Sequence, residues 1–511
     1  MRKRTKISLS HYKIGSCKMG YLVPIQLTEV LPGDTIQCAT SLFARVAPLV
    51  SPVMHPVHLK IHHWYVPYRL VWDQFEDFIT GGPDGLDTSE FPTINSPDST
   101  GFSVGSLADY LGIPTGFPGV ELSALPFRAY NLIYNEWYRD QDLETPLDLS
   151  TDSGPDSTTS LDLQRGDWAR DYFTTARPWP QKGMEVTVPV QPGGSSFDII
   201  SSGTPPLFAS GDDDTLSRIK SLYSSAQSSA SNYNALFHPH NPESGGETGG
   251  VLAGEMRFFG DHTGLKLRAA GDDALGNIDI NTLREAFALQ RFEEHRSMYG
   301  SRYVEYLRYL GIKASDARLQ RPEYLGGGKQ TIQFSEVLQT AEGTNPVGTL
   351  RGHGIAAARS NRFRRFIEEH GCIISLLLIR PISVYMQGVP RLWLNRVKED
   401  FWQKELEHIG QQEVKTQELY AGADPDDIFG YQNRYDQYRQ HENSISGEMR
   451  STLNYWHMAR DFAEAPTLNS DFINALPTNR VFASTTTDQI YFMAAHSVQA
   501  RRLLARYGNP I

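Results

Sequence analysis

Strand-like runs that end at proline are the most constraining feature of this chain. Residues 57–62 (VHLKIH) alternate apolar and polar side chains with a period of two, as a sheet with one buried and one wetter face requires. Pro32-Gly33 and Pro67 interrupt two such runs, because proline lacks the backbone N–H that a central strand donates. The pattern predicts strands joined by turns and offers no catalytic constellation, which favours a protein whose role rests on its shape.

Strand signals recur along the whole chain at wide intervals. We expect strands near residues 35–45, 57–66, 329–334, 372–387 and 487–497. The apolar run 373–379 is typical of a strand buried on both faces, and Pro381 should bend or break it. A length of 511 residues would alone favour two to four domains, but strands so far apart fit one antiparallel barrel. The predicted fold is mainly β, with long inserted loops and a few helices.

Two segments show helical periodicity instead. Between residues 69 and 79, aromatic residues recur at a spacing of three before a glycine-rich stop. A longer segment, residues 281–307, starts at Asn281, a suitable cap, and repeats apolar residues at the same spacing. We expect this second segment to be the longest helical part of the chain.

Several groups look like chemical sites without meeting the requirements of one. Among His55, His58, His62 and His63, the two that share a strand face, His58 and His62, would stand about 13 Å apart, too far to share one Zn²⁺. The run Gly326–Lys329 lacks the Ser or Thr that follows the lysine of a phosphate loop, and we expect a loop between helix and strand there. Three scattered cysteines without a CxxC are expected to be reduced, mostly buried thiols. We predict no catalytic residue, no metal site and no cofactor.

Basic residues are concentrated at the N-terminus, although the chain as a whole is acidic. The first 28 residues contain six Lys or Arg and no acid, against a formal net charge of −11. We interpret residues 1–28 as a basic arm before a domain of residues 29–511. The arm is either a solvated tail or a segment that contacts phosphate by charge alone. Its candidate DNA contacts are Arg2, Lys3, Arg4 and Lys6.

A second basic run, far from the first in sequence, is interleaved with aromatic residues. Arg362, Arg364 and Arg365 alternate with two phenylalanines in residues 362–366. Arginine pairs with phosphate and aromatic rings stack on unpaired bases, so this run can line a path for single-stranded DNA. It can equally form a subunit interface, or an edge strand that uses charge to avoid wrong pairing.

Two polar stretches are typical of loops. Residues 143–160 are rich in Asp, Ser, Thr and Pro, which predicts an exposed loop. The range of about 191–276 contains serine-rich and glycine-rich runs and has too few apolar residues for a core of its own at that length. It must therefore be carried by a scaffold or by neighbouring subunits.

Motifs from one end of the chain to the other resemble a single family. In order, they are EVLPGD (29–34), WYVPYR (64–69), LPFRAYNLIYNEWYRDQ (125–141), DYFT (171–174), PWPQKG (178–183), ARLQRPEYLGG (317–327), EHG (369–371), FGYQ (429–432), WHMARDF (456–462) and PTLN (466–469). Together they resemble the major capsid protein of the Microviridae, small icosahedral phages with single-stranded DNA, and most closely the gokushovirus branch. The ordered set is specific, whereas no single motif would be.

The resemblance implies a single eight-stranded antiparallel viral jelly-roll barrel with a structural, non-enzymatic role. It implies self-assembly into a T=1 icosahedral shell, hence sixty copies, around circular single-stranded DNA. Further implied partners are a small basic DNA-binding protein, minor virion proteins and a host cell-surface receptor, without insertion into a membrane. The implied location is the virion, assembled in the cytoplasm of a host bacterium. In gokushovirus capsid proteins, an insertion like 191–276 builds protrusions on the outer surface.

A function of another class also fits a jelly roll, namely a carbohydrate-binding or receptor-binding module. Tyr223 and Tyr233 in the polar region are then candidates for host recognition, and Trp179 is a candidate aromatic platform. The two interpretations are compatible, because an external protrusion can recognise a host while the barrel builds the shell.

Overall fold

The computed structural model describes residues 4–83, 86–184, 186–187, 199–202, 266–269, 280–299, 320–340 and 346–504. The chain divides into two compact units, residues 1–184 with 291–511 and residues 185–290. In the second unit, the described elements are the paired strands β8 (Ile199–Ser202) and β9 (Lys266–Ala269) and the first part of helix α5 (Ile280–Tyr299). The first unit contains the sheet, the candidate nucleic-acid interface and the cavity described below.

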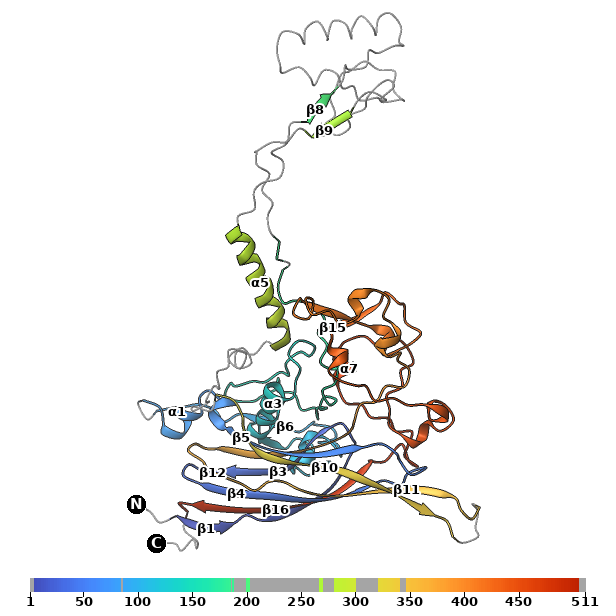
Figure 1. Cartoon of the computed structure of the whole chain (residues 1–511). Coiled ribbons are helices and arrows are strands. Elements are labelled where there is room, and N and C mark those ends of the chain that lie inside the picture. The colour runs from blue at the N-terminus through green and yellow to red at the C-terminus, as the bar shows by residue number, and fades with distance from the viewer. Residues whose placement is uncertain are drawn as a thin grey trace, which may run out of the picture. The chain divides into compact units, whose positions relative to one another are not determined.

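Ten strands of the first unit form one antiparallel sheet that curls over on itself. The path is β1-β16-β4-β11-β10-β5-β13-β3, with β2 also paired to β16 and β12 also paired to β4. In Figure 1, β1, β16 and β4 lie in one layer, and β3, β5 and β10 in the other. The bounds are β1 Thr5–Ser8, β2 His11–Cys17, β3 Leu22–Val30, β4 Thr35–Val46, β5 Val57–Pro67, β10 Glu323–Leu338, β11 Leu350–Arg359, β12 Phe363–Phe366, β13 Gly371–Pro381 and β16 Ile490–Arg502.

The connectivity is that of a jelly roll. One half contains β2, β16, β4 and β11, and the other half contains β3, β13, β5 and β10. The chain passes from one half to the other between β2 and β3, between β3 and β4, and between β4 and β5. The β10–β11 hairpin joins the halves through residues 333–338 and 350–355. The prediction of a mainly β, eight-stranded jelly-roll barrel is confirmed.

The five predicted strands are found, and the buried one is the most instructive. Residues Gly371–Ile379 of β13 are all buried, and the strand ends at Pro381, where a break was expected. Leu377 and Ile379 pack into the barrel interior. Ile374 and Leu378 face the other way, into a second core. Covering both faces explains why an unbroken apolar run, without alternation, is stable here.

Inward side chains of both halves fill the barrel. Ile25, Leu59 and Leu377 from one half meet Leu42 and Phe492 from the other. Fully burying a side chain of this size contributes roughly 1.5–3 kcal/mol. The barrel is therefore a packed core rather than a ligand cavity.

Two long insertions interrupt the sequence of barrel strands. Between β5 and β10 lie η1 (Tyr68–Leu70), α1 (Phe75–Thr80), β6 (Thr93–Asn95), α2 (Leu107–Leu111), β7 (Glu121–Ser123), α3 (Leu125–Trp137) and the second unit. Between β13 and β16 lie η3 (Arg391–Trp393), η4 (Lys398–Asp400), β14 (Gln411–Lys415), η5 (Thr416–Glu418), β15 (Ile428–Asn433), η6 (Asp436–Tyr438), η7 (Gly447–Arg450), η8 (Asn454–Trp456) and α7 (Ser470–Ile473). The two insertions share a core in which Phe173 of the first packs with Phe429 and Phe472 of the second.

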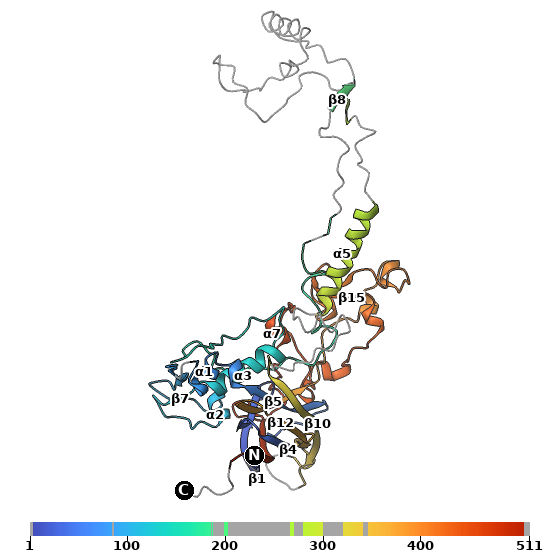
Figure 2. The same cartoon turned by 90° about the vertical axis from the view of Figure 1, so that its left-hand side faces the viewer.

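Helices α2 and α3 cover the outward face of the β3-β13-β5-β10 half (Figure 2). Phe127, Tyr130 and Ile133 recur every three residues of α3 and are all buried, which gives the helix one apolar face. The Tyr130 hydroxyl donates to the carbonyl oxygen of Leu22 at 2.9 Å and so fastens α3 to β3. Ser106 caps α2 through the backbone N–H of Asp109.

Three local predictions need correction. Residues 69–79 do not form one helix, because η1 ends at Leu70 and α1 begins only at Phe75. Asn281 is not a cap, since α5 already begins at Ile280. Gly326–Lys329 is not a loop but part of β10, and a Cβ on Gly327 would lie 2.1 Å from the Ile61 carbonyl oxygen. Glycine is needed there because two strands approach closely.

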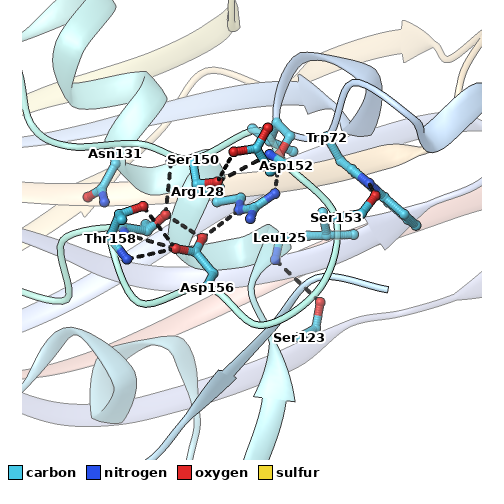
Figure 3. A network of polar contacts seen from close by, with 12 residues as sticks. Trp72, Ser123, Leu125, Arg128, Asn131, Ser150, Asp152, Ser153, Asp156 and Thr158 are labelled. Atoms are coloured by element: carbon cyan, nitrogen blue, oxygen red, sulfur yellow. Dashed lines mark hydrogen bonds and ion pairs between the residues drawn. The ribbon is translucent and has the colours of Figure 1, made fainter. Parts of the chain in front are cut away.

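The stretch 143–160 is not simply an exposed loop. Arg128 of α3 points at Asp156 (Figure 3), with 2.8 Å between Nε and Oδ2. The Asp156 carboxylate also accepts hydrogen bonds from the backbone N–H groups of Thr158 and Thr159. Both charged side chains are almost fully buried. Some polar residues of this loop therefore pair with a buried charge, and do not only face solvent.

Candidate nucleic-acid interface

The two halves of the barrel differ in how their outward faces are covered. On the β3-β13-β5-β10 half, Trp64 and Leu376 are buried in the core that contains α2 and α3. On the other half, the outward residues Tyr491 and Met493 of β16 and Phe43 of β4 are exposed. We call the outward face of β1, β2, β16, β4, β11 and β12 the bare sheet face.

The charge on the bare sheet face has a single sign. None of its six strands contains an Asp or a Glu. Strand alternation directs six basic side chains outward, namely Lys6 on β1, Arg501 on β16, Arg45 on β4, Arg351 and Arg359 on β11, and Arg364 on β12. Lys6 lies directly opposite Arg501. Because like charges opposite each other repel, this face favours an anionic partner.

The N-terminal segment and the basic run 362–366 lie at the same place. The guanidinium carbon of Arg4 is 4.9 Å from the centroid of the Phe366 ring. Arg4 also donates to Thr35 Oγ1 at 3.4 Å, and Thr35 pairs with Phe366 in the β4–β12 register. Two candidate segments more than 350 residues apart in sequence therefore belong to one surface.

The predicted basic residues do not all reach this surface. Arg4, Lys6 and Arg364 lie on the bare sheet face. Arg365 points to the other side of β12, where its Nη2 lies 3.0 Å from Glu323 Oε1. Arg362 is exposed in the short segment between β11 and β12.

Two of the predicted residues cannot be placed, and two residues of the surface were not predicted. Arg2 and Lys3 fall outside the described residues. Residues 4–28 are built into the sheet as β1, β2 and most of β3, rather than extending from it. Arg45 and Arg351 were not predicted, although alternation along the expected strand 35–45 already directs Arg45 to the same side as Phe43.

Exposed apolar and aromatic side chains are interleaved with these cations. The largest are Tyr12, Ile14, Phe43, Ile355, Phe366, Tyr491 and Met493. Arg45 lies over the Phe43 ring, 5.6 Å from its centroid. Guanidinium groups beside aromatic rings are the combination that binds the phosphates and stacks on the bases of single-stranded nucleic acid.

Comparison with known proteins decides the family. The family model described as "Capsid protein (F protein)" matches residues 1–511. The chain belongs to this capsid protein family. It is 34% identical to Capsid protein VP1 of Bdellovibrio phage phiMH2K, over 95% of this chain and 90% of that protein. It is 32% identical to VP1 of Chlamydia phage 1, over 94% and 91%, and 31% identical to VP1 of Spiroplasma virus 4, over 99% and 95%. The resemblance seen in the motifs is confirmed, and the protein is a structural capsid protein of a phage virion.

Four histidines on or next to β5 make separate contacts with different residues of the capsid protein. His55 Nε2 donates to the Ile382 carbonyl oxygen at 2.8 Å, and His63 Nδ1 lies 2.7 Å from Ser375 Oγ. His58 and His62 share the outward face of β5, as predicted, and contact Thr331 and Tyr138 separately. In the part of the chain that the structure describes, no group of three or more His, Cys, Asp or Glu residues is arranged to hold a metal ion.

The remaining predictions concern thiols, membranes and host recognition. Cys17, Cys38 and Cys372 are all free and buried, as expected. Burial raises the pKa of Cys38 to about 11, so its thiol stays protonated. No described helix has both the length and the apolar character needed to cross a membrane. Tyr223 and Tyr233 lie outside the described residues, and Trp179 is half-buried beside Lys182.

Proposed function

We propose that the capsid protein assembles into a T=1 icosahedral shell that encloses circular single-stranded DNA, with the bare sheet face turned toward the DNA. The supporting observation is that six adjoining strands contain no acid while directing Lys and Arg outward among exposed aromatic rings. Because the whole chain carries a net charge of −11, the acidic residues lie elsewhere. A single basic face suits a wall with DNA on one side only.

The double variant Arg364→Gln/Arg501→Gln tests this orientation. Particles should still assemble, because both side chains are exposed, but they should package less DNA. Each lost phosphate contact should make the negative slope of log K against log salt shallower by about 0.7 for single strands. Charge reversal at Arg2, Lys3 and Arg4 tests the N-terminal segment in the same assay.

The matched control is Lys398→Gln, which removes an exposed cation from η4, in the β13–β16 insertion. It should leave the DNA content and the salt dependence unchanged. If the double variant packages DNA as the control does at every salt concentration, the bare sheet face does not contact DNA.

The contacts between copies are expected to use exposed apolar side chains of the β13–β16 insertion. Leu392, Trp393, Trp402 and Ile409 are each more than half exposed within 18 residues of chain. Such a cluster is unusual on a monomer and common at subunit interfaces. Individual contacts can be weak, because many act together in a closed shell. The substitution Trp393→Glu should leave a folded protein that assembles poorly in electron micrographs, whereas the nearby Lys398→Gln should assemble normally.

A second role is supported by the separate compact unit of residues 185–290, which includes the range 191–276. We propose that this unit builds surface protrusions and binds a host cell-surface receptor, with Tyr223 and Tyr233 as candidate contacts. Deletion of residues 200–270 should preserve assembly and abolish adsorption to the host. Particles that still adsorb would assign recognition to another protein or surface.

We further propose that assembly takes place in the cytoplasm of the host bacterium, together with a small basic DNA-binding protein and minor virion proteins. Three buried, unpaired thiols support a reducing compartment. Mass spectrometry of purified virions should detect the additional proteins, and virions that contain the capsid protein alone would contradict this part of the proposal.

A further inference from the structure

A polar cavity of about 300 Å³ lies outside the barrel, within the first unit. Its floor is the outward face of β5 and β13, with His62 and Arg380. Tyr138 and Arg139 come from the chain that directly follows α3. Asp167 comes from a later part of the same β5–β10 insertion. Neither the capsid fold nor the bare sheet face accounts for this cavity.

Arg380 is a cation without a described partner. It is half-buried, and its guanidinium makes no hydrogen bond or ion pair with any described residue. Lys60 and Lys329, directly opposite each other on β5 and β10, lie on the same sheet face, and neither is ion-paired with a described carboxylate. Burial first, and then Arg380 and Lys329, lower the pKa of Lys60 to about 8. This part of the sheet therefore holds mutually repelling cations beside an open space.

The hydrogen bonds of Tyr138 determine which ring nitrogen of His62 carries the proton. Trp64 Nε1 can only donate, and it donates to the Tyr138 hydroxyl at 3.1 Å. The Tyr138 proton is then directed to His62 Nδ1, 2.6 Å away. A His62 ring that accepts at Nδ1 carries its proton on Nε2 when neutral. Burial lowers the pKa of His62 to about 4, so the ring is neutral at pH 7.

Among the described residues, no acid of the cavity lining forms an ion pair with Arg380, although the charge of Asp167 acts on it at longer range. Asp140 and Asp142 are already paired with Arg177, each at 3.2 Å, and Asp142 also with Lys182 at 2.7 Å. Asp167 is the remaining acid, and burial first, with Glu144 and Asp140, raises its pKa to about 8. Burial therefore favours the protonated form of Asp167, which Arg380 partly opposes, and Asp167 Oδ1 has no hydrogen-bond partner among the described residues.

We propose that this cavity binds a phosphate group, either inorganic phosphate or the phosphate of a nucleotide. Arg380 supplies the charge, and His62 Nε2–H and the Asp167 carboxyl supply donors, so the lining offers what a tetrahedral oxyanion accepts. Arg139, whose Nε is buried without a described partner, lies in the same lining. The volume is at the small end of the range for ligand sites and accommodates a nucleoside monophosphate.

Isothermal titration of the purified full-length protein with inorganic phosphate at pH 7 tests the site. The wild type should bind, and Arg380→Gln should bind at least about tenfold more weakly, because one charge-assisted hydrogen-bonding group is lost. Lys398→Gln, which removes an exposed cation of η4 outside both the cavity lining and the bare sheet face, should bind like the wild type. Parallel titrations with thymidine monophosphate and with oligo(dT) distinguish free phosphate, a nucleotide and a DNA strand as the source.

Asp167→Asn is the second variant, which keeps the proposal testable if Arg380→Gln fails to fold. Asp167 is the acid of the described lining without an ion pair, so its replacement should leave phosphate binding equal or tighter, and clearly weaker binding would contradict the proposed arrangement. The proposal is overturned if the folded wild type does not bind phosphate, or if Arg380→Gln binds it as tightly as the wild type. Either result is independent of whether the protein assembles or packages DNA.

Discussion

Arg128 on α3 and Asp156 in the following loop form a buried ion pair, with 2.8 Å between Nε and Oδ2 and side chains that are 1% and 0% exposed. Arg128 Nη1 also donates to the Val71 carbonyl oxygen at 3.0 Å, which ties α3 to the chain after β5. Burial alone would raise the pKa of Asp156, but hydrogen bonds from Thr159 and Arg128 outweigh it and lower this pKa. The carboxylate is therefore charged in the folded protein.

Breaking this pair from one side should be costly. Asp156→Asn leaves the Arg128 guanidinium buried without a counter-ion, so we expect a loss of about 3–5 kcal/mol in the free energy of unfolding. Urea denaturation of the wild type and variant measures the difference. The control is Glu407→Gln, which removes the half-exposed pair with Arg439 and should cost under about 1 kcal/mol. Equal losses of unfolding free energy in Asp156→Asn and Glu407→Gln would contradict the expectation that breaking the buried ion pair costs more than breaking the half-exposed one.

The glycine run of β10 is a packing feature, and this leads to a second prediction. A Cβ on Gly327 would overlap the Ile61 carbonyl oxygen at 2.1 Å, so Gly327→Ala should force β10 away from β5 and cost about 2–3 kcal/mol. In contrast, Gly105→Ala meets no atom within 4 Å and bears only the strain of its positive φ. Thermal denaturation should rank Gly327→Ala as the less stable variant, and the reverse ranking would contradict the close approach of the two strands.

The barrel could be predicted from the sequence because its strands follow simple rules. The alternation in β5 and the continuous apolar run of β13 each predict a strand, with one and two buried faces respectively. The prolines predict where the strands end. The insertions follow no such periodicity. Arg128 bonds both the Val71 carbonyl oxygen, between η1 and α1, and Asp156 in the stretch 143–160, and it is distant in sequence from both. Local patterns do not contain tertiary contacts of this kind.

The candidate interface was predictable only in part for a similar reason. Net basic charge near Arg4 and Arg364 is visible in the sequence, but their shared surface depends on β12 pairing with β4 and β1 with β16. The opposite orientation of Arg365, toward Glu323, depends on the register of a four-residue strand. The cavity beside Arg380 gave no sequence signal, since its lining comes from separate elements.

Buried histidines should make the protein sensitive to acid. Burial first, with His496 and His62, lowers the pKa of His63 to about 3, while the unfolded chain has about 6.5. Below pH 6.5 the unfolded state binds the extra proton, so stability is lost as the pH falls toward 3. His63 alone should cost about 2 kcal/mol between pH 6.5 and 5. His63→Gln should show a shallower pH dependence in urea denaturation, and the exposed His408→Gln should match the wild type. Parallel pH profiles for all three proteins would contradict the assignment.

Arg460 joins the two insertions through aromatic faces and should not be replaceable by lysine. Its guanidinium carbon lies 4.0 Å from the Phe472 ring centroid and 5.1 Å from that of Trp168. Its Nη2 also donates to the Phe472 carbonyl oxygen at 2.8 Å. Trp168 belongs to the β5–β10 insertion and Phe472 to the β13–β16 insertion, so one planar cation is packed between both.

We expect Arg460→Lys to cost about 2 kcal/mol, because an ammonium group cannot stack on several rings and hydrogen-bond at once. The loss of stability should be confined to the segments that pack around Arg460. Hydrogen exchange should accelerate at residues 168–176 and 470–473 and stay unchanged in β13, whose core does not include Arg460. Arg450→Lys, at an exposed arginine of the same insertion that bonds only the Met386 carbonyl oxygen among described residues, is the control. Unchanged exchange at both segments in Arg460→Lys would show that the aromatic core holds the insertions together without this cation.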